Sequence, residues 1–264
     1  MININTNSID LILINNKENN NVNKELYRVL KPGGYLFGID KPHKSHNSVC
    51  DIEDIGFIIK DSISYFFKEN EDVKQDVICL AMKPLSEKNF AENVMKWGTG
   101  GLNIDACRIA HNEKTNSCIR KSPKFRGICG EWSDSGEVIT TANPEGRYPA
   151  NFIISEDVAP VLDKQSGYSK SSPFKAKGTI EAINSNLGIK NRQGSNHNDE
   201  GGASRFFYNA KSYKDLLRYI TVLGLPPKES KVLFIGFDNV DEIIEEINKE
   251  SNVNYEAITI GGIE

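Results

Sequence analysis

The stretch IDLILINNKENNN, residues 9–21, joins a run of apolar residues to a cluster of asparagines. Residues 9–14 have the short, apolar composition of a strand buried on both faces, which is typical of an interior parallel strand. Apolar positions at helical spacing follow in 23–30, and KPGG (31–34) contains the Pro and Gly that end helices. With a second apolar run at 35–39, the sequence predicts a strand, helix and parallel strand in succession.

The next segment continues this pattern with a helix and a pair of strands. Residues 48–56 predict a short helix that ends at Gly56. Residues 57–67 and 76–84 predict two strands joined by an acidic turn, and an antiparallel pairing is open to them.

The middle of the chain differs from both ends in composition. Residues 85–208 are rich in Gly, Ser, Asn and Lys, and their apolar runs are short and irregular. Phe206 and Phe207 lie in one such run, which we expect to be a core strand. Regular patterns return after this region, with predicted elements at 213–225 (helix), 231–237 (strand), 239–251 (helix) and 255–264 (strand). We therefore expect an α/β protein with two halves, 1–84 and 209–264, around a loop-rich insertion at 85–208.

Composition narrows the class of protein. The 264 residues are 38% hydrophobic and 26% charged, as in ordinary globular proteins. No apolar run approaches the ~20 residues that cross a bilayer, and the N-terminus lacks the zones of a signal peptide. Five cysteines, an odd number without a CxxC pair, argue against a disulfide framework. These features predict a cytoplasmic protein with no membrane partner.

Charge is unevenly distributed along the chain, although the net charge is only −4. Residues 108–126 are strongly basic, whereas 229–264 hold nine acids against Lys231 and Lys249. Either run could be an ordinary solvated face, but the basic centre could also attract a polyanion. The DNA-contacting candidates are Arg120, Lys121, Lys124, Arg126, Lys175, Lys177, Lys190 and Arg192.

Four stretches of the chain, taken in order, resemble one family. They are LYRVLKPGGYL (26–36), KPLSEKNFAENVMKWGTGGLNIDACRI (83–109), GRYPANFI (146–153) and GGASRFFYNAK (201–211). In this order they resemble bacterial and phage DNA amino-methyltransferases, which methylate adenine N6 or cytosine N4 with S-adenosylmethionine. The resemblance implies a circularly rearranged Rossmann-like methyltransferase sheet: the catalytic strand comes first, the DNA-contacting region second and the cofactor strand last.

The resemblance also assigns positions at the end of the first strand. In the family this strand ends in Asp or Asn, two prolines and an aromatic residue, which accept the N–H bonds of the target amine and stack on a flipped-out base. Asn15 matches the first position. Asn16 and Lys17 replace the prolines, and Glu18 replaces the aromatic residue. This departure implies a degenerate catalytic site, and the local composition alone favours a mobile surface loop.

The cofactor positions depart from the family as well. Phe234 stands where the family has an acid, Gly236 is out of register with the glycine-rich turn, and Asp238 follows the strand. Glu264 matches the acid that binds the ribose, and the family's His-Pro-Thr-Val-Lys-Pro stretch before the cofactor strand is missing. The expected cofactor is S-adenosylmethionine if the protein is active and none otherwise.

Three hypotheses for function stay open at this point. The first is a degenerate DNA amino-methyltransferase that keeps the fold and binds double-stranded DNA, a partner protein or a second copy of itself. The second is an active DNA methyltransferase, and the third is a structural or regulatory protein, such as a phage component. A metal site is not expected, because His43, His46 and Cys50 lack a matching pair at zinc spacing.

Overall fold

The protein is described by a computed structural model that covers residues 3–18, 22–110, 118–121, 126–127, 130–131, 137–140, 145–170, 200–225, 229–251 and 254–260. Between residues 111 and 144 the description is limited to the backbone of short strands. The predicted positions Lys124, Lys175, Lys177, Lys190, Arg192 and Glu264 lie outside the described residues.

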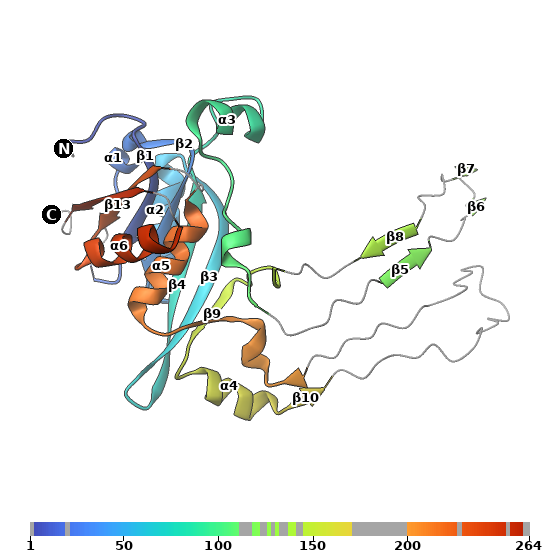
Figure 1. The fold of residues 1–264 in the computed structure, drawn as a ribbon. Helices are drawn as coiled ribbons and strands as arrows, with labels where there is room; N and C mark the ends of the chain where they lie inside the picture. The colour runs from blue at the N-terminus through green and yellow to red at the C-terminus, as the bar shows by residue number, and fades with distance from the viewer. Residues whose placement is uncertain are drawn as a thin grey trace.

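A mostly parallel sheet forms the centre of the molecule (Figure 1). Its strand order is β12-β9-β3-β4-β2-β1-β13-β14. Only β4 runs against its neighbours among these strands, since it pairs antiparallel with both β2 and β3. The strands are β1 (Ile9–Asn15), β2 (Leu30–Asp40), β3 (Ile58–Glu69), β4 (Asp72–Met82), β9 (Phe152–Ser155), β12 (Tyr208–Ala210), β13 (Ser230–Ile235) and β14 (Tyr255–Ile260).

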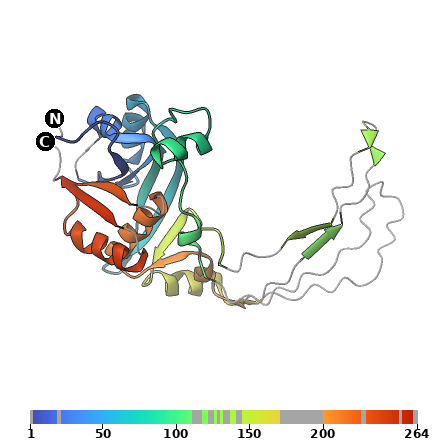
Figure 2. The ribbon, with the colours of Figure 1, turned by 45° about the horizontal axis from the view of Figure 1, so that its top comes forward.

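Helices cover both faces of the sheet, which gives an α/β fold in three layers. On one face, α5 and α6 pack over Leu11, Leu13 and Phe37, and Figures 1 and 2 show these helices in orange and red. On the other face, α1 and α2 pack over Ile12 and Ile14. The helices are α1 (Lys24–Val29), α2 (Ser45–Ile55), α3 (Phe90–Trp97), α4 (Ala159–Ser166), α5 (Tyr213–Gly224) and α6 (Val240–Ser251).

Shorter elements complete the described chain. Two 3₁₀ helices, η1 (Asp105–Cys107) and η2 (Ala203–Phe206), lie outside the sheet. The three small antiparallel pairs are β5 (Cys118–Lys121) with β8 (Glu137–Thr140), β6 (Arg126–Gly127) with β7 (Gly130–Glu131), and β10 (Ser169–Lys170) with β11 (Glu200–Gly201).

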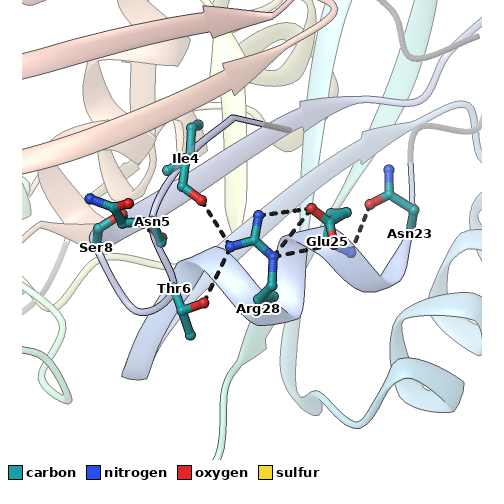
Figure 3. Close-up of polar contacts among 7 residues, drawn as sticks. All are labelled: Ile4, Asn5, Thr6, Ser8, Asn23, Glu25 and Arg28. Atoms are coloured by element: carbon teal, nitrogen blue, oxygen red, sulfur yellow. Dashed lines mark hydrogen bonds and ion pairs between the residues drawn. The ribbon is translucent and has the colours of Figure 1, made fainter. Parts of the chain in front are cut away.

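The expected first unit is confirmed, because β1, α1 and β2 form a parallel strand–helix–strand unit. α1 begins at the cap residue Asn23, whose side chain accepts a hydrogen bond from the Glu25 amide at 3.0 Å (Figure 3). Arg28 of the same helix pairs with Glu25 at 2.8 Å and donates to the Ile4 carbonyl at 2.8 Å. The short helix therefore also fixes the segment that leads into β1.

The helix ends just before KPGG, as expected, but KPGG lies within the next strand rather than ahead of it. β2 already begins at Leu30, and the pairing with β1 shifts between Ile9 and Leu11, so that residues 31–34 form a bulge in the strand. Gly33 has φ 76°, and its amide donates to the Lys83 carbonyl at 2.9 Å. Pairing with the chain after β4 therefore keeps this segment in the sheet.

The strands at 57–67 and 76–84 form an antiparallel pair, as the sequence allowed, and the helix at 48–56 appears as α2 with Gly56 at its end. β9, which lies within the expected insertion, joins the main sheet beside β3 and β12. The sheet thus includes part of the segment 85–208, and the division into two halves and an insertion stays a prediction.

The expectation that Phe206 and Phe207 form a core strand is wrong, because both precede β12. Phe206 ends η2 rather than lying in a strand, and 38% of it is exposed. The guanidinium groups of Arg147 and Arg205 lie 4.9 and 4.1 Å from its ring centre, so the ring packs against cations instead of the core. Phe207, which follows, contacts the Phe152 ring of β9 at 4.7 Å between centres.

Candidate functional site at the carboxyl edge of the sheet

The order of the strands marks one place on the sheet as a candidate site. From β1 the chain passes through α1 to β2 on one side, whereas from β13 it passes through α6 to β14 on the other side. In open parallel sheets, ligands bind at the carboxyl ends of the strands where the direction of winding reverses. β1 and β13 are adjacent and parallel, so this point lies between Asn15 and Gly236.

The structure brings these two predicted positions into direct contact. The Asn15 side-chain amide donates to the Gly236 carbonyl at 3.0 Å, and its oxygen accepts a hydrogen bond from the Lys17 backbone amide at 3.3 Å. Gly236 has φ 73°, a conformation that favours glycine, and its amide donates to the Ile260 carbonyl at 3.0 Å. The tips of β1, β13 and β14 are thereby tied to one another.

The other predicted cofactor positions lie in different surroundings. The Phe234 side chain is completely buried and meets the Phe237 ring edge-on, with 6.0 Å between ring centres. Phe237 and Val240 are also buried, and they fill the turn from β13 into α6 with apolar side chains. Asp238 is exposed. The structure therefore brings Asn15 and Gly236 together and leaves Phe234 in the core.

The expectation of a surface loop after β1 is wrong for Asn16 and Lys17. Asn16 is buried, and its backbone amide donates to the Ile39 carbonyl at 2.8 Å. The Lys17 ammonium forms an ion pair with Asp76 at 2.6 Å, and the two side chains are 21% and 4% exposed. Glu18 does lie at the surface, where it pairs with Lys41 at 2.7 Å. The turn-forming composition predicted that the chain turns here, but it did not predict the ion pair between Lys17 and the buried Asp76.

Buried carboxylates surround this edge. Burial raises the pKa of Asp76, and the hydrogen bond and charge of Lys17 lower it only in part. Burial also raises the pKa of Asp40 at the end of β2, against the hydrogen bond that Ser48 donates to it at 2.9 Å. Sequence analysis did not single out Asp76. Its only sign in the sequence is an acid at the start of the predicted apolar strand at 76–84.

A cleft of about 600 Å³ opens beside Lys17 at the same edge. The ends of β3, β9 and β12 and the start of α5 form its walls. Its lining consists of Lys17, Tyr65, Phe67, Lys68, Ser155, Glu156, Asp157, Lys211, Ser212 and Tyr213. This volume is within the range of small-molecule sites, which span roughly 300–1,000 Å³.

The remaining expectations concern DNA contacts, metal binding and membrane-spanning helices. Of the DNA-contacting candidates, Arg120, Lys121 and Arg126 are described by backbone alone, in β5 and β6. In the part of the chain that the structure describes, no group of three or more His, Cys, Asp or Glu side chains is placed to hold a metal ion. No helix in this part is long and apolar enough to cross a membrane.

Comparison with known proteins gives likenesses of fold at low identity. No family model and no curated protein match the chain. Among solved structures, the M1.HpyAVI–SAM complex is similar with a TM-score of 0.41 and 10% identity over 96% of this chain and 81% of that chain. A structure of M1.HpyAVI has the same TM-score and identity, over 96% and 80% of the two chains. At these values neither likeness assigns a family or an activity to this chain.

Proposed function

We propose that this chain has the scaffold of a DNA amino-methyltransferase but does not transfer methyl groups, and that it acts by binding duplex DNA or a partner protein in the bacterial cytoplasm. The sequence motifs quoted above support the scaffold. The strand order supports it as well, because the strand with the Asn15 tip precedes the strand with the Gly236 tip in sequence and lies beside it in the sheet.

The observation that carries the proposed loss of activity is the self-contained hydrogen bonding at the β1 tip. An exocyclic amine becomes a nucleophile when fixed acceptors take its N–H bonds, and a flipped-out base needs a surface on which to stack. Here both ends of the Asn15 amide group bond to the chain itself. Where the family has the second proline, Lys17 turns into the protein and pairs with Asp76. Glu18, at the place of the stacking ring, is an exposed acid.

The cofactor side supports the same proposal. A glycine-rich turn lets the backbone approach a cofactor closely, whereas Phe237 and Val240 fill this turn with buried side chains. Phe234 places a buried ring at the position of the family's acid. Asp238, Asp241 and Glu242 surround the start of α6 with negative charge, which disfavours the carboxylate end of S-adenosylmethionine.

Methyl transfer tests the proposal most directly. The protein is incubated with tritiated S-adenosylmethionine and mixed genomic DNA, with Asn15→Ala as the matched control. We expect no label above background for either protein. Label that appears with the wild type and disappears with Asn15→Ala would establish an active methyltransferase and overturn the proposal.

Two binding measurements separate the remaining parts of the proposal. Calorimetric titration with S-adenosylmethionine is expected to give no binding tighter than about 100 μM, which corresponds to roughly −5.5 kcal/mol. Duplex DNA binding is expected to weaken steeply between roughly 50 and 200 mM salt if the basic centre contacts phosphates. Absence of DNA binding at the lowest salt would leave protein contact as the mode of action.

A further inference from the structure

Lys17 reaches an unusual environment for a residue at the tip of a strand. Its side chain leaves the end of β1 and passes the edge of β2, which separates β1 from β4, to pair with Asp76 of β4. The ammonium nitrogen lies 4.3 Å from the centre of the Tyr213 ring at the start of α5 and 5.9 Å from that of Phe67 at the end of β3. Three elements thus converge on one cation.

The chemistry of these three partners fits an organic cation. A carboxylate compensates the charge, and aromatic faces attract a cation within about 6 Å through their quadrupoles, most strongly where water is excluded. The Asp76 side chain is 4% exposed, so the carboxylate lies in such a place, whereas the Lys17 side chain, 21% exposed, also reaches the cleft. A divalent metal is a poor match, because it would require several oxygen ligands and rings supply none. Alkylammonium and sulfonium groups are monovalent organic cations that this combination can bind.

We propose that Asp76, Phe67 and Tyr213 form a recognition site for an organic cation, and that Lys17 is its built-in occupant. Lys17, Phe67 and Tyr213 line the cleft, and Asp76 pairs with the Lys17 ammonium. The cleft continues from Lys17 along Tyr65, Ser155 and Asp157, so a larger cationic molecule would have room beside the site. The inference rests on the proposed function, because a chain that does not transfer methyl groups can keep a cation of its own at this edge of the sheet.

The β1 tip gives reason to expect that the site outlasts removal of Lys17. The turn is held by main-chain bonds, from the Asn16 amide to the Ile39 carbonyl and from the Lys17 amide to the Asn15 side chain. Neither bond uses the Lys17 side chain. Truncation at this residue should therefore empty the site and leave its walls in place.

Chemical rescue of Lys17→Ala tests the proposal. The substitution deletes three methylene groups and the ammonium, which together correspond to propylammonium. Thermal unfolding of Lys17→Ala is followed against increasing propylammonium chloride, with propanol as the neutral probe and sodium chloride at equal ionic strength. We expect a saturable rise in Tm with propylammonium, binding at least tenfold tighter than propanol, and no such rise for the wild type.

The double variant Lys17→Ala/Asp76→Asn is the matched control, and it is expected to lose this preference for the cation. A rise of equal size in the wild type, or with propanol, would overturn the proposal. If Lys17→Ala does not fold alone, refolding with propylammonium but not with propanol supports the site, and failure in both overturns it. Titration of the wild type with S-adenosylmethionine tests the proposed function separately. Binding would contradict the proposed function, but it would not change whether propylammonium stabilises Lys17→Ala.

Discussion

Lys17, which is partly buried, and Lys83, which is buried, bring ammonium groups to opposite edges of the same sheet, with different partners. Lys17 lies at the carboxyl edge and pairs with the Asp76 carboxylate at 2.6 Å. Lys83 follows β4, which runs in the opposite direction, so it lies where β1 and β2 begin. Its ammonium donates to the side-chain oxygen of Asn7 at 2.8 Å and to the carbonyls of Tyr27 and Leu30 at 2.6 and 2.7 Å.

The difference indicates what each edge does. At the amino edge, three neutral oxygens use all three ammonium donors, and the bonds tie the N-terminal segment, α1 and the start of β2 together. This arrangement serves the fold. Both ammonium groups lie near an aromatic ring, since the Tyr27 ring centre is 4.5 Å from the Lys83 nitrogen and the Tyr213 ring centre is 4.3 Å from the Lys17 nitrogen. The carboxylate of Asp76 and the adjoining cleft distinguish the carboxyl edge, as expected for a site that recognises charge. Each prediction below tests this contrast.

The largest effect is expected for Lys17→Met, which keeps most of the length of the side chain and removes its charge. Asp76 would be left buried without its partner, and breaking a buried pair in this way destabilises proteins by about 3–5 kcal/mol. Urea unfolding at pH 7 measures the loss. Because burial already raises the pKa of Asp76, the loss should shrink as the pH falls and the carboxyl becomes protonated.

Lys68→Met serves as the control, because Lys68 lines the same cleft. A change within about 0.5 kcal/mol is expected for this surface substitution. Equal losses for the two variants would contradict a special role for the Lys17–Asp76 pair.

The amino edge should respond to pH in a different, alkaline range. Burial lowers the pKa of Lys83 from 10.5 to about 8. Between these values the unfolded chain holds a proton that the folded protein has released, so the Lys83 contribution to stability rises with pH. The free energy of unfolding of the wild type, minus that of Lys83→Met, should increase by up to about 1.4 kcal/mol per pH unit between pH 8 and 10.

Subtracting the variant is necessary because two thiols act against Lys83. Burial raises the pKa of Cys79 and of Cys107 to about 12, so both thiols stabilise the folded protein less as the pH rises above 9. These contributions are present in both proteins and cancel. A difference that stays constant from pH 7 to 10 would show that the folded protein keeps the Lys83 proton.

Asn15→Ala should have a smaller effect, since it removes neutral hydrogen bonds. The lost bond to the Gly236 carbonyl corresponds to about 1 kcal/mol in the free energy of unfolding. Amide hydrogen exchange should accelerate at the tips of β1 and β13 and stay unchanged around Lys83. Faster exchange at both edges would mean that Asn15 supports the whole sheet rather than the site.

Local patterns predicted most of the sheet but few of the contacts at its edges. The run at 9–14 and the helical spacing at 23–30 were sufficient for β1 and α1, because burial and periodicity are visible in neighbouring residues. The inclusion of KPGG in β2 was not predicted, because its partner, the chain around Lys83, is about fifty positions away. Lys17 was assigned to a surface loop for the same reason, since Asp76 lies in a strand that composition does not connect with it.

The smallest effect is expected for Glu18→Gln, which sharpens the contrast within a single turn. Glu18 pairs with Lys41 at 2.7 Å, nearly the distance of the Lys17–Asp76 pair, but its side chain is 78% exposed. Exposed pairs gain little because water screens the charges and the side chains lose entropy, so a change below about 0.5 kcal/mol is expected in urea unfolding. A loss similar to that of Lys17→Met would mean that distance rather than burial sets the strength of these pairs. A small loss would mean that, of the charged side chains in this turn, Lys17 is the one whose charge matters for stability.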